Sequence, residues 1–191
     1  RCCTQNGIRG GSATVHFPIW HQEIRDILVL KNNKGTEDNR VRKLDYSIQI
    51  SKLFYERFIQ DEEISLFSPH SVPDLFESFG TPDFDELYCR YENDESIPRT
   101  TIGAQELIMD LLKERSETGR IYIMNIDHCN EHSSFKDKVS MSNLCQEITL
   151  PTEPIQHIDS IDGEIALCIL SAINVGLSLI HISEPTRRLV I

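Results

Sequence analysis

The chain has 191 residues, of which 39% are hydrophobic and 26% are charged. This is the composition of a globular domain, and it excludes collagen-like, low-complexity and wholly disordered chains. The formal net charge of -11 disfavours non-specific binding to nucleic acid or to an anionic membrane, so we expect neither as a partner.

The six cysteines give no sign of a disulfide framework. None belongs to a CxxC pair, and the chain is long enough to form a core without disulfide bonds. We therefore expect free thiols in a reducing compartment, and a cytoplasmic protein. His128, Cys129 and His132 closely follow Asp127, but they lack the paired spacing of a structural zinc site, so we expect no bound metal.

Strand and helix patterns alternate along the chain. Apolar residues predict strands over 12–20, 44–50, 64–67 and 121–126, of which the second is half-buried and the last is buried on both faces. Helical spacing and helix-start residues predict helices that begin near Ile24, Ser51, Ser71, Thr81 and Ala104. Gly35 can end the first of these helices and Gly119 the last. The alternation predicts an α/β fold with a largely parallel sheet or barrel.

Residues 165–183 contain no charged side chain and are numerous enough to span a bilayer. Polar residues interrupt this run, and no basic segment precedes it. We expect a buried strand that continues into a packed segment, not a transmembrane helix.

The stretch from Asn143 to Glu147 carries polar or reactive groups at alternate positions. In an extended segment, Asn143, Cys145 and Glu147 would share one face. Their amide, thiol and carboxylate can orient a substrate, supply a reactive sulfur and act as a general base. The pattern alone favours a plainer interpretation, a polar hairpin with a buried cysteine, because cysteine often serves as a small apolar residue.

The segment from Cys3 to Gly11 is rich in glycine. Glycine lets a backbone approach a ligand closely, and Arg9 can contact a phosphate or a base edge. The segment lacks the GK[ST] ending of a Walker loop, and a flexible connection is the plainer interpretation. Cys168 lies in an apolar run, where a thiol packed in the core is the simplest interpretation.

Short strings along residues 1–178 form a specific series. They are Arg9-Gly10-Gly11, Phe17-Pro18-Ile19-Trp20-His21, Leu30-Lys31-Asn32-Asn33, Asn39-Arg40-Val41-Arg42, Leu66-Phe67-Ser68-Pro69-His70, Thr118-Gly119-Arg120-Ile121-Tyr122, Asp127-His128-Cys129-Asn130, Ser142-Asn143-Leu144-Cys145 and Gly163-Glu164-Ile165-Ala166-Leu167-Cys168. In order and spacing, the series resembles the family of large, catalytic subunits of class I ribonucleotide reductase. The resemblance replaces the plainer interpretations of the 143–147 stretch, the glycine-rich segment and Cys168.

The resemblance implies an oxidoreductase, a ribonucleoside-diphosphate reductase. It also implies the fold of this family, here a partial ten-stranded α/β barrel with a central finger loop. Residues 1–178 are expected to be a fragment of this catalytic barrel domain. Residues 179–191 do not fit the family and are similar to translated sequencing-adapter strings, so we expect a non-family, artefactual tail. The isolated chain, which would lack most of the barrel, is expected to be inactive.

The resemblance also implies roles for the site residues. Cys145 becomes a thiyl radical that takes the 3′ hydrogen of a ribonucleoside diphosphate, in a site expected to be buried. Glu147 accepts the 3′-hydroxyl proton, and Asn143 hydrogen-bonds the ribose hydroxyls. Cys168 matches one member of the redox cysteine pair, whose other member is expected upstream of Arg1.

The glycine-rich segment resembles the specificity loop between an effector nucleotide, ATP or a dNTP, and the substrate base. Gln5 and Arg9, followed by Gly10 and Gly11, match the positions that read effector or base, although Asn6 stands where a smaller residue is expected. The implied partners are a metal-containing small subunit that supplies the radical, thioredoxin or glutaredoxin, and a second large subunit. The chain itself is expected to bind no metal or prosthetic cofactor. The alternative is an inactive, nucleotide-responsive module.

Overall fold

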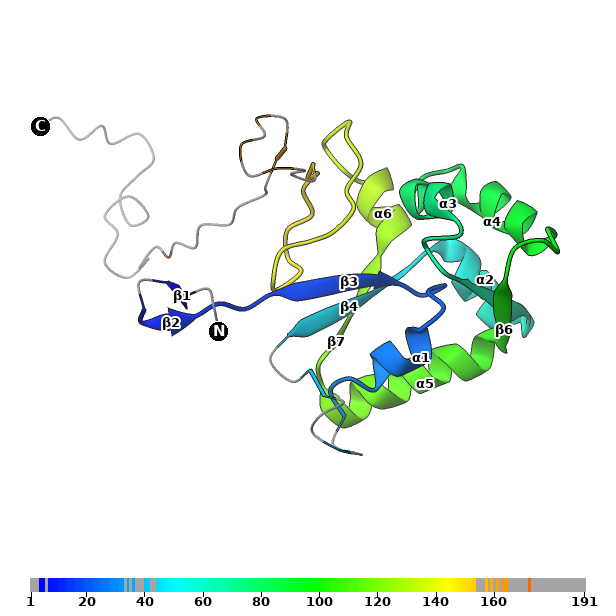
Figure 1. The fold of residues 1–191 in the computed structure, drawn as a ribbon, viewed down its shortest axis with the longest axis horizontal. Helices are drawn as coiled ribbons and strands as arrows, with labels where there is room; N and C mark the ends of the chain where they lie inside the picture. Colours follow the sequence, from blue (N-terminus) through cyan, green and yellow to red (C-terminus); the bar gives the residue numbers. More distant parts are fainter. Residues whose placement is uncertain are drawn as a thin grey trace, which may run out of the picture.

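The computed structural model of the chain describes residues 4–5, 7–32, 34, 36, 40–41, 44–153, 157, 159, 161, 163–164 and 172. A parallel sheet of three strands lies at the centre of this part (Figure 1). In spatial order, its strands are β3 (Thr14–Pro18), β4 (Asp45–Ile50) and β7 (Ile121–Asn125). The sequence predicts all three, and their parallel pairing confirms the predicted sheet type.

One face of the sheet is apolar and packs against helices. Helices α1 (Ile24–Leu28) and α5 (Ala104–Thr118) lie together below the strands (Figure 1). Side chains alternate along a strand, so Tyr46, Ile48 and Ile50 share this face of β4, and all three are buried. The Tyr46 hydroxyl donates a hydrogen bond to the carbonyl oxygen of Leu28 at 2.9 Å, which fixes the end of α1 against the sheet.

The connection from β4 to β7 contains a second group of elements. Helix α2 (Lys52–Gln60) leads to an antiparallel pair, β5 (Glu63–Phe67) with β6 (Arg99–Gly103), and helices α3 (Pro73–Ser78) and α4 (Phe84–Glu92) lie between these strands in sequence. The sequence predicts every element except β6. Its first three residues are polar and exposed, so no apolar alternation marks it as a strand.

An aromatic cluster joins this group to the sheet. Its buried rings are Trp20, Phe54, Phe67, Phe79, Phe84 and Tyr88. The Tyr88 hydroxyl donates to the carbonyl oxygen of Ser65 at 2.6 Å and accepts from the Ser65 N–H at 2.9 Å. The cluster therefore packs α2 and α4 against β5 and the end of β3.

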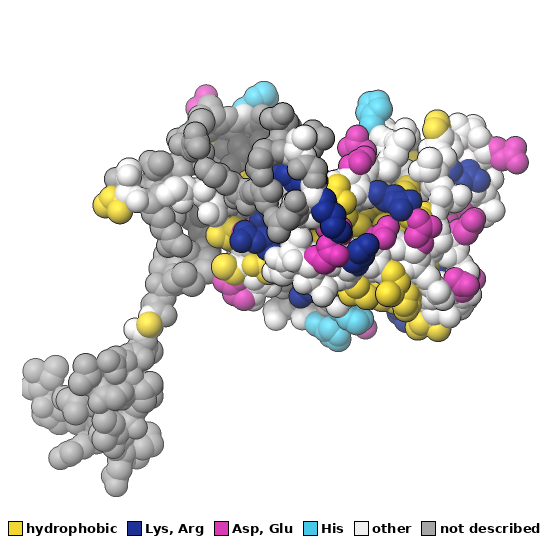
Figure 2. Space-filling model, turned by 90° about the horizontal axis from the view of Figure 1, so that it is seen from below, with side chains coloured by type: hydrophobic (Ala, Val, Ile, Leu, Met, Phe, Trp, Pro, Cys, Tyr) yellow, Lys and Arg dark blue, Asp and Glu magenta, His cyan; other side chains and the backbone are white. Residues whose placement is uncertain are grey.

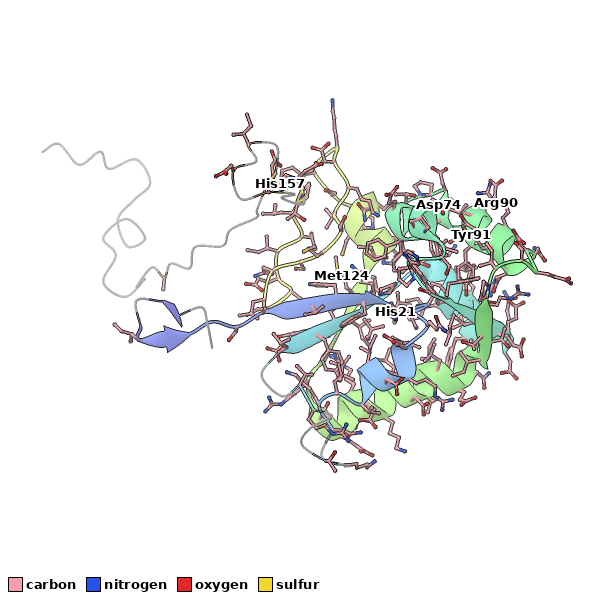
Figure 3. All side chains as sticks on the ribbon, viewed as in Figure 1. His21, Asp74, Arg90, Tyr91, Met124 and His157 are labelled. Carbon is pink, nitrogen blue, oxygen red and sulfur yellow. The ribbon has the colours of Figure 1, made fainter. Side chains whose placement is uncertain are left out.

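Side-chain bonds also fasten the helices to one another. Figure 3 shows Asp74 of α3 beside Tyr91 of α4, where the Tyr91 hydroxyl donates to the Asp74 carboxylate. On the surface seen from the side of α5, basic and acidic side chains alternate with hydrophobic patches (Figure 2). There, Arg25 of α1 lies 3.0 Å from Glu106 and 3.2 Å from Asp110 of α5. These ion pairs are exposed and contribute little stability.

One helix boundary and one helix cap differ from the sequence prediction. Helix α1 ends at Leu28, earlier than its apolar spacing predicts, and Lys31 beyond it is buried in an ion pair with Asp45. Helix α2 begins where predicted, but the Ser51 hydroxyl does not cap it. A carboxylate oxygen of Asp127 accepts the Lys52 N–H at 2.6 Å instead. Tertiary contacts therefore set both the boundary and the cap.

The described strands do not close into a barrel. They form the three-stranded parallel sheet and two antiparallel pairs, so the parallel α/β sheet is the part of the predicted barrel that is visible. Among the described residues, no helix is both long enough and apolar enough to cross a membrane. The uncharged run over 165–183 lies outside the described residues except for Ala172.

Candidate functional site

Residues 142–149 form a tight turn with Leu144 and Cys145 at its tip. The Gln146 N–H donates to the carbonyl oxygen of Asn143 at 3.2 Å, and Ser142 forms an antiparallel bridge with Thr149. The extended segment predicted here is therefore wrong, because the chain reverses between Asn143 and Gln146. Asn143, Cys145 and Glu147 lie on one turn and do not share the face of a strand.

The side chain of Asn143 stabilises this turn from within. Its Oδ1 accepts the Ile148 N–H at 3.1 Å, and the Asn143 N–H donates to the Ile148 carbonyl oxygen at 3.3 Å. The Ser142 hydroxyl donates to the same carbonyl oxygen at 2.5 Å. The Asn143 amide nitrogen Nδ2 has no hydrogen-bond partner in the described part of the chain, so it remains able to donate to a ligand.

Cys145 and Glu147 are both exposed. The expectation of a buried site does not hold for these residues, because the open sheet lies on only one side of the turn. The plainer interpretation, a polar hairpin with a buried cysteine, is right about the hairpin and wrong about the cysteine, because Cys145 is not buried. The turn presents a thiol, a carboxylate and an amide within five consecutive residues.

The turn lies on the polar face of the sheet. Strand register places Thr14 and His16 of β3, Ser47 and Gln49 of β4 and Met124 of β7 on this face, opposite the helices; Figure 3 labels Met124. The Thr14 hydroxyl donates to the Leu144 carbonyl oxygen at 2.7 Å. Nε2 of His16 lies 3.2 Å from the Ser142 carbonyl oxygen. Both contacts join residues far apart in the sequence.

The polar residues beneath the turn are buried wholly or in part, and burial shifts the pKa of one of them. Ser47 and Gln49 are almost fully buried, which corrects the prediction that this strand is half-buried. Gln49 Nε2 donates to the Ser140 carbonyl oxygen at 2.7 Å, so the segment leading into the turn covers the strand. Burial also lowers the pKa of His16, although the contact with Ser142 opposes this effect. At neutral pH, His16 is therefore uncharged.

Sequence reasoning missed the residues that hold the turn, namely Thr14, His16, Gln49 and Gln146. A signal for the first two was present, because they alternate with the apolar Val15 and Phe17 in a predicted strand. That alternation shows a polar face, but it does not show which segment lies on it.

The glycine-rich segment forms a ribbon that extends beyond the start of β3 (Figure 1). Strands β1 (Thr4–Gln5) and β2 (Arg9–Gly10) are antiparallel, and Gln5 pairs directly with Arg9 in the register. Gly7, in the turn between them, has φ +71°, a conformation that favours glycine. A Cβ atom at Gly10 would meet no atom within 4 Å, so that glycine is not required by a close contact in this structure.

Of the other sequence candidates, one lies outside the described residues and one lies apart from the turn. Cys168 lies outside the described residues. Asp127, His128 and Cys129 belong to helix α6 (Ile126–Glu131). In the chain as far as it is described, no three His, Cys, Asp or Glu side chains are grouped so as to hold a metal ion. Asp127 serves to cap α2, and burial raises the pKa of the Cys129 thiol.

Comparison with known proteins identifies related sequences. The family model described as "Ribonucleotide reductase, barrel domain" matches residues 1–186. The ribonucleoside-diphosphate reductase subunit alpha of Haemophilus influenzae is 54% identical over 181 residues, which cover 92% of this chain and 24% of that protein. Subunit alpha of Escherichia coli reductase 1 is 50% identical, and the match covers 81% of this chain and 21% of that protein. Subunit alpha of the Enterobacteria phage T4 enzyme is 46% identical, and the match covers 90% of this chain and 23% of that protein. The chain thus spans about a quarter of the length of these relatives.

Proposed function

Because the chain belongs to the ribonucleotide reductase barrel-domain family, we propose that it forms part of the catalytic barrel of a ribonucleoside-diphosphate reductase alpha subunit. The reaction reduces ribonucleoside diphosphates to deoxyribonucleoside diphosphates. One observation carries the proposal: the turn at 143–146 holds Cys145 at its tip above the polar face of a parallel sheet. We assign this turn as the finger loop of the barrel.

In the proposed reaction, a metal-containing small subunit removes one electron and one proton from the Cys145 thiol. The resulting thiyl radical takes the hydrogen atom from C3′ of the substrate and becomes a thiol again. The Glu147 carboxylate accepts the 3′-hydroxyl proton. The 2′-hydroxyl takes a proton from one thiol of the Cys168 pair and leaves as water. As the two cysteines form a disulfide, they deliver a hydrogen atom to C2′ and one electron to the 3′-keto group, and Glu147 returns its proton to O3′. Cys145 returns its hydrogen atom to C3′ and becomes a thiyl radical again, to which the small subunit returns the electron and proton. Thioredoxin or glutaredoxin then reduces the disulfide.

The geometry of the turn supports these roles. Asn143 Oδ1 is already bonded to Ile148 N–H, and its free Nδ2 group is a donor for a ribose hydroxyl. Cys145 and Glu147 have no hydrogen-bond partner among the described residues, so both are available to a substrate. A thiyl radical must be shielded from water and from competing reductants. Because Cys145 is exposed, we propose that the 191-residue chain has no reductase activity by itself.

The β1–β2 ribbon is the proposed specificity loop. Gln5 and Arg9 are direct partners in its register, so one effector nucleotide or substrate base can contact both positions. The left-handed Gly7 gives the ribbon a turn that can change conformation at low energetic cost. ATP or a dNTP is the proposed effector, bound where two large subunits meet.

A chimaeric enzyme tests the proposed function. This chain replaces the aligned 181 residues in the alpha subunit of the Haemophilus influenzae enzyme, and the small subunit and a dithiol are supplied. We expect deoxynucleotide formation, which Cys145→Ser abolishes without affecting effector binding, because a hydroxyl is not readily oxidised to a radical. Cys89→Ser is the matched control, since Cys89 is also exposed but lies on α4. Turnover by the Cys145→Ser enzyme would refute the radical role, and effector binding without turnover by the unmutated chimaera would favour a nucleotide-responsive module.

The role of Cys168 has its own test in the same chimaera. During a single turnover without reductant, Cys168 should form a disulfide with a cysteine outside this chain. Cys168→Ser should block reduction by thioredoxin while leaving substrate binding intact. A free Cys168 thiol after single turnover, detected by mass spectrometry, would exclude the redox role.

A further inference from the structure

Two side chains of β3 fasten the Cys145 turn to the sheet, and the reaction proposed above uses neither. Thr14 and His16 are two residues apart, so they point to the same face of the strand. Thr14 bonds the Leu144 carbonyl oxygen at the tip of the turn. His16 contacts both sides of the turn, through the Ser142 carbonyl oxygen at 3.2 Å and the Gln146 amide Nε2 at 3.3 Å.

Nε2 of His16 lies 3.2 Å from the Ser142 carbonyl oxygen and 3.4 Å from the Ser142 backbone nitrogen. The shorter contact assigns the ring hydrogen to Nε2, which donates to that carbonyl oxygen, and the unprotonated Nδ1 accepts from the Gln146 amide. Burial lowers the pKa of His16 and so favours this uncharged ring. Every polar atom of the ring then has a partner on the turn.

Gln146 explains why the turn needs such support. Its φ of +65° is left-handed, a conformation that costs free energy for a residue with a side chain. Such residues persist where surrounding contacts determine the conformation. The contact with His16 is the hydrogen bond that the Gln146 side chain makes in the described part of the chain.

We propose that His16, assisted by Thr14, is a positioning residue that fixes the Cys145 sulfur for transfer of the substrate hydrogen atom. The inference rests on the proposed function, because positioning matters only if Cys145 reacts. Thr14 holds the tip, and His16 holds the residues on either side of it, Ser142 and Gln146. Displacing a reacting atom by about 1 Å can cost about a hundredfold in rate, so loosening these bonds should slow the reaction.

The first experiment measures the turn directly in the 191-residue chain. Amide hydrogen exchange is followed by mass spectrometry on a peptide covering 142–149, which contains the bonded N–H groups of Asn143, Gln146 and Ile148. His16→Leu removes both ring nitrogens at similar volume, and exchange should become about tenfold faster, the factor expected for one ordinary hydrogen bond. His16→Gln keeps a donor for Ser142 and should restore most of the protection.

Matched variants separate this effect from general destabilisation. Val15→Thr is isosteric, lies next to His16 on the opposite face of β3 and should leave the exchange unchanged. If His16→Leu unfolds the chain, Gln146→Leu and Thr14→Val test the same contacts from their other ends, and both should accelerate exchange only over 142–149. Unchanged exchange in these variants would overturn the inference.

The second experiment measures the chemical step in the chimaeric reductase. His16→Leu should lower kcat by about tenfold to a hundredfold, keep KM within about twofold, and raise the isotope effect with 3′-deuterated substrate. Loss of folded enzyme alone would lower the active fraction without changing that isotope effect. Normal kcat and isotope effect in His16→Leu would refute the positioning role. If the unmutated chimaera were inactive, the proposed function would fail, and exchange alone would decide whether His16 holds the turn.

Discussion

The two faces of strand β4 are equally buried but are built from different chemistry. On one face, Ile48 is fully buried in the core beside the helices. On the other, its neighbour Ser47 is fully buried, and Gln49 on the same face donates to Ser140 of the covering segment 139–149. Burial of apolar area stabilises the first face without requiring one specific geometry. On the second face, the buried Gln49 amide finds its partner in the Ser140 carbonyl oxygen, and this need for a partner specifies where the covering segment lies, whereas the Ser47 hydroxyl has no partner among the described residues. The apolar face therefore stabilises the fold, and the polar face positions the Cys145 turn.

The sharpest test of this comparison uses the neighbours Ile48 and Ser47. Ile48→Ala should lower the free energy of unfolding by about 2–5 kcal/mol, because it leaves a cavity in a closely packed core. Ser47→Ala should be neutral or slightly stabilising, since the buried Ser47 hydroxyl has no hydrogen-bond partner among the described residues. Urea denaturation of both variants measures the difference. Equal losses of stability would show that the two faces contribute alike.

Gln49 should give an intermediate effect. Gln49→Leu removes the bond to the Ser140 carbonyl oxygen and leaves that oxygen beneath the segment without its partner. We expect a loss of about 1–3 kcal/mol, together with faster amide exchange over 139–149. Gln49→Glu is an informative control because it keeps the shape but replaces the donor with a charge, and it should destabilise at least as much. Full stability of Gln49→Leu would mean that this bond does not hold the segment.

The smallest expected effect is the pH dependence contributed by the polar face. Burial holds the pKa of His16 below the usual 6.5, and burial also lowers that of His21, opposed by Glu23. The unfolded chain therefore binds more protons below about pH 6.5, so stability is retained above that pH and falls as the pH drops towards the folded-state pKa values. His16→Gln should make this fall shallower between about pH 7 and pH 5, measured by urea denaturation. An unchanged slope would show that His16 does not contribute.

Sequence and tertiary structure decided different features of this fold. Local periodicity and turn residues, which act over a few neighbouring positions, predict several elements. These are the parallel strands, α5 with the glycine that ends it, and the helices that begin after Ser71 and Thr81. The sequence did not predict β6, because its polar residues form a strand only by pairing with β5, which lies far away in the sequence. The early end of α1 and the cap of α2 depend on Asp45 and Asp127, which lie far along the chain.

The candidate site shows the same division. The catalytic roles of Asn143, Cys145 and Glu147 stay a prediction that came from the family resemblance, and the resemblance itself was confirmed by comparison. The sequence by itself did not determine that these residues form a turn, because the turn depends on Asn143 bonding Ile148 and on the left-handed Gln146. Nor did it reveal Thr14 and His16, which contact the turn across 130 and 126 positions of the chain, respectively. Local periodicity determines which face of a strand is polar, whereas only the folded chain determines what that face binds.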